Sequence, residues 1–135
     1  MNITERNIKM WSTIGSRATF GLAALELAKK VDNLYAIIDK NNFQQTGSNK
    51  EIMNVESLRD KWSSFGWHTV ELDGHNIEEL YNFFNDSGKI NKPKAIIAHT
   101  IKGKGFSFSE NNNDWHHSIL TKSFYDKALK ELIKK

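Results

Sequence analysis

Cysteine is absent from all 135 residues, which excludes a disulfide framework and any thiolate metal site. This absence is compatible with a reducing cytoplasm, where we expect the protein to act. Proline occurs only once, at Pro93, and no apolar run approaches the ~18 residues of a membrane-spanning helix. The N-terminal stretch MNITERNIKMW lacks the apolar core of a secretory signal. The sequence therefore predicts a globular domain that does not engage a membrane.

The charge of the chain points to a solvated surface. Hydrophobic residues make up 39% and charged residues 26%, an ordinary balance for a single domain with its own core. The net charge is +3, and the lysines are scattered rather than gathered beside aromatic residues. A nucleic-acid-binding surface needs such a basic cluster. We do not expect a nucleic-acid partner, and a basic binding module is the last of three functional hypotheses.

Short apolar runs alternate with helical periodicity along the chain. Strands are predicted over residues 34–39, 67–72 and 95–100. Two helices are predicted over residues 13–30 and 55–65. A third begins after Asn76, its predicted cap, with Glu79 as the capping-box partner, and a fourth begins at about Thr121. Strands separated by amphipathic helices form βαβ units. The fold class is therefore α/β, a partial three-layer sandwich with a mostly parallel sheet of at least three strands.

Polar stretches follow each predicted strand. They read DKNNFQQTG, DGHN and HTIKGKG, and a long loop, residues 106–120, comes after the last of them. In parallel sheets ligands bind beyond the carboxyl ends of the strands. We therefore look for function at this edge, although disorder is the alternative interpretation of the long loop.

Two adjacent asparagines, Asn41 and Asn42, end the first predicted strand. They can be turn residues, since asparagine bonds to nearby backbone groups and tolerates left-handed conformations. Alternatively, the amide oxygen of Asn41 and the backbone carbonyl of Phe43 are two oxygen ligands for Mg²⁺. Residue type alone favours the turn.

The stretch HTIKGKG is a candidate phosphate contact. Gly103 allows the backbone to approach a ligand closely, and Lys102 brings positive charge. A plain glycine-rich loop is the alternative, because no Walker A pattern is present. In the long loop, His116 follows Trp115, and a histidine there can donate to a phosphate or move a proton near neutral pH.

These stretches together resemble transketolase, a thiamine-diphosphate enzyme. The resemblance is carried by AIIDKNNFQQTG, LRDKWSSFGWHTVELDGHNIEEL, KPKAIIAHTIKGKGFSF and ENNNDWHHSI, in the order and spacing of that family. It covers residues 34–132 and corresponds to the C-terminal part of the diphosphate-binding domain, in the compact form found where the enzyme is split into two subunits. The resemblance implies that the domain 34–135 is a portion of that fold.

The resemblance also implies roles for particular residues. Asn41 and the carbonyl of Phe43 match the family's ligands to the divalent cation, Mg²⁺, which holds the diphosphate of the cofactor. His116 matches a histidine near the diphosphate and the substrate, which makes it the candidate catalytic residue. His117 stands where the family usually has glycine. Lys102 and Gly103 remain the candidate cofactor contacts.

The opening of the chain resembles a different part of the same family. Residues 3–33 resemble the start of the pyrimidine-binding domain, which in the usual enzyme follows the diphosphate domain. We therefore divide the chain into a helical segment, 1–33, and a diphosphate-domain portion, 34–135. On this interpretation the chain is a fragment or mosaic.

Two family features are missing from this sequence. The first aspartate in the chain is Asp32, so no GDG motif precedes Asn41, and the activating glutamate of the pyrimidine domain is absent as well. The first hypothesis is therefore part of an enzyme that moves two-carbon ketol units between sugar phosphates and is inactive by itself. It would act with a complementary transketolase half or as a homodimer. The second hypothesis is a non-catalytic interaction or regulatory fragment that pairs with a transketolase half.

Overall fold

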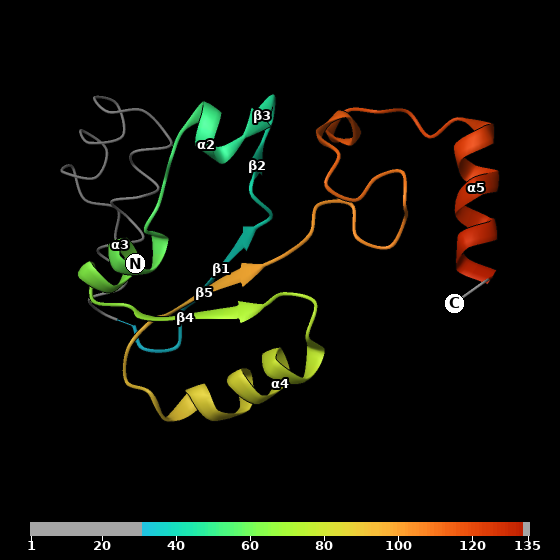
Figure 1. The fold of residues 1–135 in the computed structure, drawn as a ribbon. Helices are drawn as coiled ribbons and strands as arrows, with labels where there is room; N and C mark the ends of the chain where they lie inside the picture. Colours follow the sequence, from blue (N-terminus) through green and yellow to red (C-terminus); the bar gives the residue numbers. More distant parts are fainter. Residues whose placement is uncertain (1–30, 134–135) are drawn as a thin grey trace, which may run out of the picture.

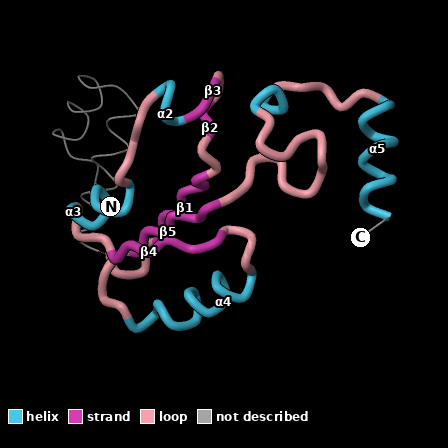
Figure 2. The backbone as a smooth tube through the Cα atoms, in the orientation of Figure 1, coloured by secondary structure: helices cyan, strands magenta, loops and turns pink. Residues whose placement is uncertain are grey.

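The computed structural model describes residues 31–133. Three parallel strands form the main sheet, in the order β1 (Tyr35–Lys40), β5 (Lys94–His99) and β4 (His68–Asp73). A small antiparallel pair, β2 (Phe43–Gln44) and β3 (Gly47–Ser48), leads into α2 (Asn49–Ile52). The remaining elements are α3 (Leu58–Ser64), α4 (Ile77–Asp86), η1 (Ser87–Lys89), η2 (Asn113–His116) and α5 (Lys122–Ile133). Figure 1 labels the strands and most of the helices, and Figure 2 shows the long loop that separates β5 from α5.

The core lies on the central strand. Ala95, Ile96 and Ile97 in β5 are completely buried, so both faces of this strand are covered. A parallel strand with a neighbour on each side reads as a continuous apolar run, which is how AIIA appears in the sequence. By contrast, Ile37 on the edge strand β1 is 61% exposed. The predicted α/β class and its parallel sheet are confirmed, and the fold is partial.

The helices lie on opposite sides of the sheet. The connection from β1 to β4 crosses the sheet in one direction and the connection from β4 to β5 returns, so right-handed crossovers place α3 and α4 on different faces. Figure 1 shows this arrangement. Phe84 of α4 contacts the ring of Tyr35 with 5.4 Å between centroids, and Phe83 stacks on His68 at 6.4 Å. The layers are therefore helix, sheet and helix.

The predicted start of α4 is confirmed at its cap and wrong in one detail. The side chain of Asn76 accepts the backbone N–H groups of Glu78 and Glu79, as an N-cap should. The capping box is not formed, because the N–H of Asn76 donates to the carbonyl of Asp73 (3.0 Å). The Glu79 carboxylate accepts instead from the N–H of Asp73 (3.1 Å), and so ties the helix to the end of β4.

Some predictions fall outside the described residues. The helix over 13–30 and nearly all of the segment 1–33 lie there. Within residues 31–133, no helix combines the length and the apolar character needed to cross a membrane.

Candidate functional site

The loops that follow β1, β4 and β5 lie at one edge of the sheet, because all three strands are parallel and in register. The last paired residues are Lys40, His99 and Asp73. Every residue predicted to act at the site follows one of these strand ends along the chain. The edge is therefore the place where the candidate side chains can meet.

Asn41 forms a turn immediately after β1. Its Oδ1 accepts the backbone N–H of Phe43 at 3.0 Å, and Asn42 has a left-handed backbone with φ of 67°. The turn interpretation of this pair is thus what the structure shows. An amide oxygen has two lone pairs, so Oδ1 of Asn41 retains the capacity for another partner.

The carboxylate of Asp39 joins the ends of β1 and β5. Its Oδ2 accepts from Nδ2 of Asn41 at 3.2 Å, and its Oδ1 accepts from the hydroxyl of Thr100. Thr100 also places its backbone N–H 3.4 Å from the carbonyl of Lys40. Asp39 was not among the residues predicted from sequence. Its only signal there is its position as the acid that begins the polar stretch DKNN.

Lys102 and His116 are brought together by the fold. Nζ of Lys102 lies 3.4 Å from Nδ1 of His116, although the two residues are 14 positions apart. Nδ2 of Asn113, in the same 3₁₀ turn as His116, donates to the carbonyl of Gln45 at 3.4 Å. The long loop thus returns to the turn that follows Asn41, and it brings an imidazole and an ammonium group to that edge.

Gly103 has a structural reason to be glycine. Its φ is +69°, and a Cβ at this position would lie 2.2 Å from the carbonyl oxygen of Ser109. The hydroxyl of Ser109 donates to the carbonyl of Gly103 at 2.8 Å, and the N–H of Asn111 donates to the carbonyl of Lys102 at 2.9 Å. The close approach that the structure shows at Gly103 is therefore to the loop itself.

An aromatic cluster packs this loop against α5. Phe108, Trp115 and Phe124 form a triangle of ring contacts, with centroids 4.9 Å, 5.1 Å and 4.9 Å apart. Phe124 belongs to α5, and the carboxylate of Glu131 in the same helix accepts from the N–H of Ser107 at 2.9 Å. The loop over 106–120 is consequently packed against α5, which argues against the disorder interpretation.

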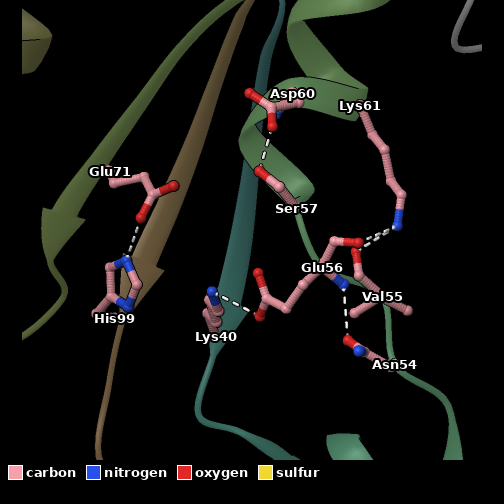
Figure 3. Close-up of polar contacts among 9 residues, drawn as sticks. All are labelled: Lys40, Asn54, Val55, Glu56, Ser57, Asp60, Lys61, Glu71 and His99. Carbon is pink, nitrogen blue, oxygen red and sulfur yellow. Dashed lines mark hydrogen bonds and ion pairs between the residues drawn. The ribbon is translucent and has the colours of Figure 1, made fainter.

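One ion pair and one imidazole–carboxylate hydrogen bond lie on the sheet face opposite α4. Figure 3 shows Lys40 beside Glu56 (2.8 Å) and His99 beside Glu71 (2.7 Å). The hydrogen bond from Lys40 lowers the pKa of the Glu56 carboxyl, and the positive charges of Lys40 and Lys61 add to the effect. Glu56 therefore stays ionised to a lower pH than an ordinary glutamate, and its pair with Lys40 ties the segment before α3 to the end of β1.

Comparison with known proteins agrees with this geometry. The family model described as transketolase, thiamine diphosphate binding domain, matches residues 16–132. The chain belongs to this transketolase family. The match begins inside the segment 1–33, and the division of the chain at residue 33 stays a prediction.

Relatives of the family cover most of this chain, while the chain covers a small part of each of them. One of the subunits of apulose-4-phosphate transketolase from Phocaeicola vulgatus is 42% identical over 104 residues, which are 76% of this chain and 37% of that protein. Transketolase of Mus musculus is 36% identical over 103 residues, again 76% of this chain but 16% of the mouse protein. The crystal structure of Campylobacter jejuni transketolase superposes with a TM-score of 0.72 and 29% identity, covering 80% of this chain and 17% of that one. The chain thus spans well under half the length of these relatives.

The residues present fit a divalent cation in part. Oδ1 of Asn41 and the carbonyl of Phe43 are hard oxygen donors, the kind that Mg²⁺ prefers and supplements with phosphate oxygens and water. Among residues 31–133 there is no group of three or more His, Cys, Asp or Glu placed to hold a metal. The donor set therefore suits a cation that is shared with a diphosphate.

Proposed function

We propose that this chain supplies part of the diphosphate-binding site of a transketolase-type enzyme, which moves two-carbon ketol units between sugar phosphates. The proposal is supported by two sets of contacts at one edge of the sheet. Asp39 links the Asn41 turn to Thr100 at the end of β5, and Nζ of Lys102 lies 3.4 Å from Nδ1 of His116 in the segment that follows β5. The family match supports thiamine diphosphate as the cofactor. The cation, the sugar phosphates and a cytoplasmic location are proposals that follow from the family.

In this proposal each residue has a defined task. Asn41 and the carbonyl of Phe43 hold Mg²⁺ against the diphosphate. Lys102 and the backbone at Gly103 contact the cofactor, and Lys102 brings a positive charge that offsets the negative charge of the diphosphate. His116 holds or moves a proton beside the substrate. Thiamine diphosphate, when bound, supplies the nucleophilic carbon that takes up the two-carbon unit.

A second polypeptide completes the enzyme in this proposal. Three relatives are named as single subunits of transketolases, and such a name points to a complementary partner. The 135 residues contain no GDG motif before Asn41. We therefore expect negligible ketol transfer by the chain alone. A homodimer is the other assembly that would join two half-sites.

Calorimetric titration with thiamine diphosphate and Mg²⁺ tests this function. The chain is titrated with and without a pyrimidine-domain subunit of a two-subunit transketolase, beside the variants Asn41→Ala and Asn85→Ala. We expect binding in the mixture, weakened at least about tenfold by Asn41→Ala because a cation ligand is lost, and unchanged by Asn85→Ala on the exposed side of α4. If the cofactor binds neither to the chain alone nor to the mixture, the proposed role in cofactor binding is overturned. If the chain alone transfers ketol units, the proposal that it needs a second polypeptide is overturned.

A second candidate is a non-catalytic fragment that pairs with a transketolase half. It is favoured by large apolar side chains exposed on β1 and α4, where Ile37 is 61%, Ile77 81% and Tyr81 65% exposed. Exposed apolar surface of this kind often marks a protein interface. Size-exclusion chromatography of the mixture shows whether a complex forms, and the titration above shows whether that complex binds the cofactor. A non-catalytic fragment would form the complex, and the complex would not bind the cofactor.

A further inference from the structure

Asp39 holds a position from which one carboxylate can orient the side chain of Asn41. We infer that Asp39 is a positioning residue, which fixes the amide of Asn41 with its oxygen available to a cation and ties it to the start of the loop that carries Lys102. This inference rests on the proposed function, because it assigns a task at the same site. The residue lies outside the set of proposed cofactor contacts.

The first step of the argument is the choice between two amide orientations. A carboxylate only accepts hydrogen bonds, so its neighbour on Asn41 must be the Nδ2 donor, which lies 3.2 Å from Oδ2 of Asp39. The N–H of Phe43 selects the same orientation from the other side, because it needs an acceptor and finds Oδ1 at 3.0 Å. With both constraints the oxygen faces Phe43, whose carbonyl is the second proposed ligand. Without Asp39, only one of these two constraints remains.

The second step concerns the other oxygen of the same carboxylate. Oδ1 of Asp39 accepts from the hydroxyl of Thr100, the first residue after β5. Thr100 stands two positions before Lys102, whose ammonium group reaches His116. The carboxylate of Asp39 therefore adds a side-chain link between the Asn41 turn and the start of the Lys102 loop to the backbone hydrogen bond from Thr100 to Lys40.

The expected effect is on metal affinity rather than on folding. Residues that orient a metal ligand without touching the metal typically change affinity by about 10- to 100-fold when they are replaced. Asp39 is exposed, so its replacement leaves the buried residues of β5 in place. Loss of its negative charge also weakens cation binding, and the experiment must therefore separate charge from orientation.

Titration of the full 135-residue chain with Mn²⁺, followed by electron paramagnetic resonance with thiamine diphosphate and the pyrimidine-domain subunit present, tests the inference. Mn²⁺ takes the same oxygen ligands as Mg²⁺. We expect Asp39→Asn to weaken binding by about 10-fold or more, as an orienting residue does. Thr100→Val keeps the charge of Asp39 and removes only the hydroxyl, so a several-fold loss there, restored by Thr100→Ser, identifies orientation as the cause. Asp86→Asn, the same change of charge at the end of α4, should leave the affinity unchanged.

A second measurement reads the orientation directly, in the chain without ligand. In protein labelled with ¹⁵N-asparagine, the side-chain NH₂ signals of Asn41 should shift in Asp39→Asn and remain in place in Asp86→Asn. If the chain binds Mn²⁺ and Asp39→Asn binds it equally well, the inference is overturned. If the wild-type chain binds no Mn²⁺, the proposed function fails and the NMR result decides the orientation alone. Unshifted Asn41 signals would then overturn the inference that Asp39 orients Asn41, and shifted signals would support that inference.

Discussion

The backbone N–H of Ile101 donates a hydrogen bond of 2.8 Å to Nε2 of His75. Ile101 is the second residue after β5, and His75 lies in the turn between β4 and α4. A backbone N–H only donates, so Nε2 of His75 is the acceptor of this bond. The start of the Lys102 loop is thus held from the β4 side by His75 and from the β1 side by Asp39.

Replacing His75 should loosen Ile101 alone. In His75→Phe the N–H of Ile101 loses its acceptor, and since a hydrogen bond contributes about 1 kcal/mol net, its amide exchange should speed up roughly fivefold. Hydrogen exchange followed by NMR measures this, with amides inside β5 as the internal reference. His75→Gln offers an acceptor again and should restore part of the protection. Equal exchange at Ile101 in the wild type and His75→Phe would show that the bond contributes nothing.

Replacing Gly103 by alanine should strain the loop. The new Cβ would lie 2.2 Å from the carbonyl oxygen of Ser109 on a backbone with φ of +69°. A side chain in such a conformation costs on the order of 1–3 kcal/mol, and the collision adds to that. Urea unfolding should therefore show a lower midpoint for Gly103→Ala. Gly88→Ala is the matched control, because nothing lies within 4 Å of a Cβ there. Equal midpoints for the two variants would contradict this account.

Core and edge isoleucines should differ sharply in their contribution. Ile96 is completely buried in the central strand, whereas Ile37 is 61% exposed on β1. Ile96→Ala should lower the free energy of unfolding by roughly 2–5 kcal/mol through lost burial and a residual cavity. Ile37→Ala should change it by about 0.5 kcal/mol or less. Urea denaturation of both variants measures this. A large loss at Ile37 would mean that this side chain is covered in solution.

The pair of Lys40 and Glu56 predicts a dependence of stability on pH. The pKa of Glu56 is lowered from its ordinary 4.5 by the hydrogen bond from Lys40. A depressed folded-state pKa stabilises the fold above the unfolded value, and this contribution is lost as the pH falls through the folded value. Thermal midpoints of the wild type should therefore converge on those of Glu56→Gln as the pH drops from about 6 to about 3. Parallel curves for the two proteins would rule out this linkage.

The elements with strong periodicity could be predicted from sequence. The strand predicted over 34–39 is β1, at Tyr35–Lys40, and the helix predicted from Thr121 is α5, at Lys122–Ile133. A continuous apolar run or a repeat of 3.6 residues determines the type of such an element, and its ends shift by a residue because capping depends on neighbours. The helix predicted over 55–65 is shorter, because Ser57 caps it and α3 begins at Leu58.

The small pair β2 and β3 and the contacts of the site could not be predicted. Asn42, directly before the hairpin, has a left-handed backbone that the sequence does not specify, and the two strands are two residues long, too short for any periodic pattern. The contact of Asp39 with Thr100 joins residues 61 positions apart, and nothing in either local sequence indicates it. The residues Asn41, Lys102 and His116 could be proposed from their place after strands and from the family resemblance. The contact of Lys102 with His116, and the link from Asn41 through Asp39 to Thr100, needed coordinates.

The central strand is also the last of the three to be synthesised. β1 and β4 do not pair with each other, and both pair with β5, which begins at Lys94. During translation the first two strands therefore wait without a hydrogen-bonded neighbour from this sheet until about residue 99 has left the ribosome. A nascent chain stopped before β5 could not form this three-stranded sheet, because β5 is the neighbour of both other strands.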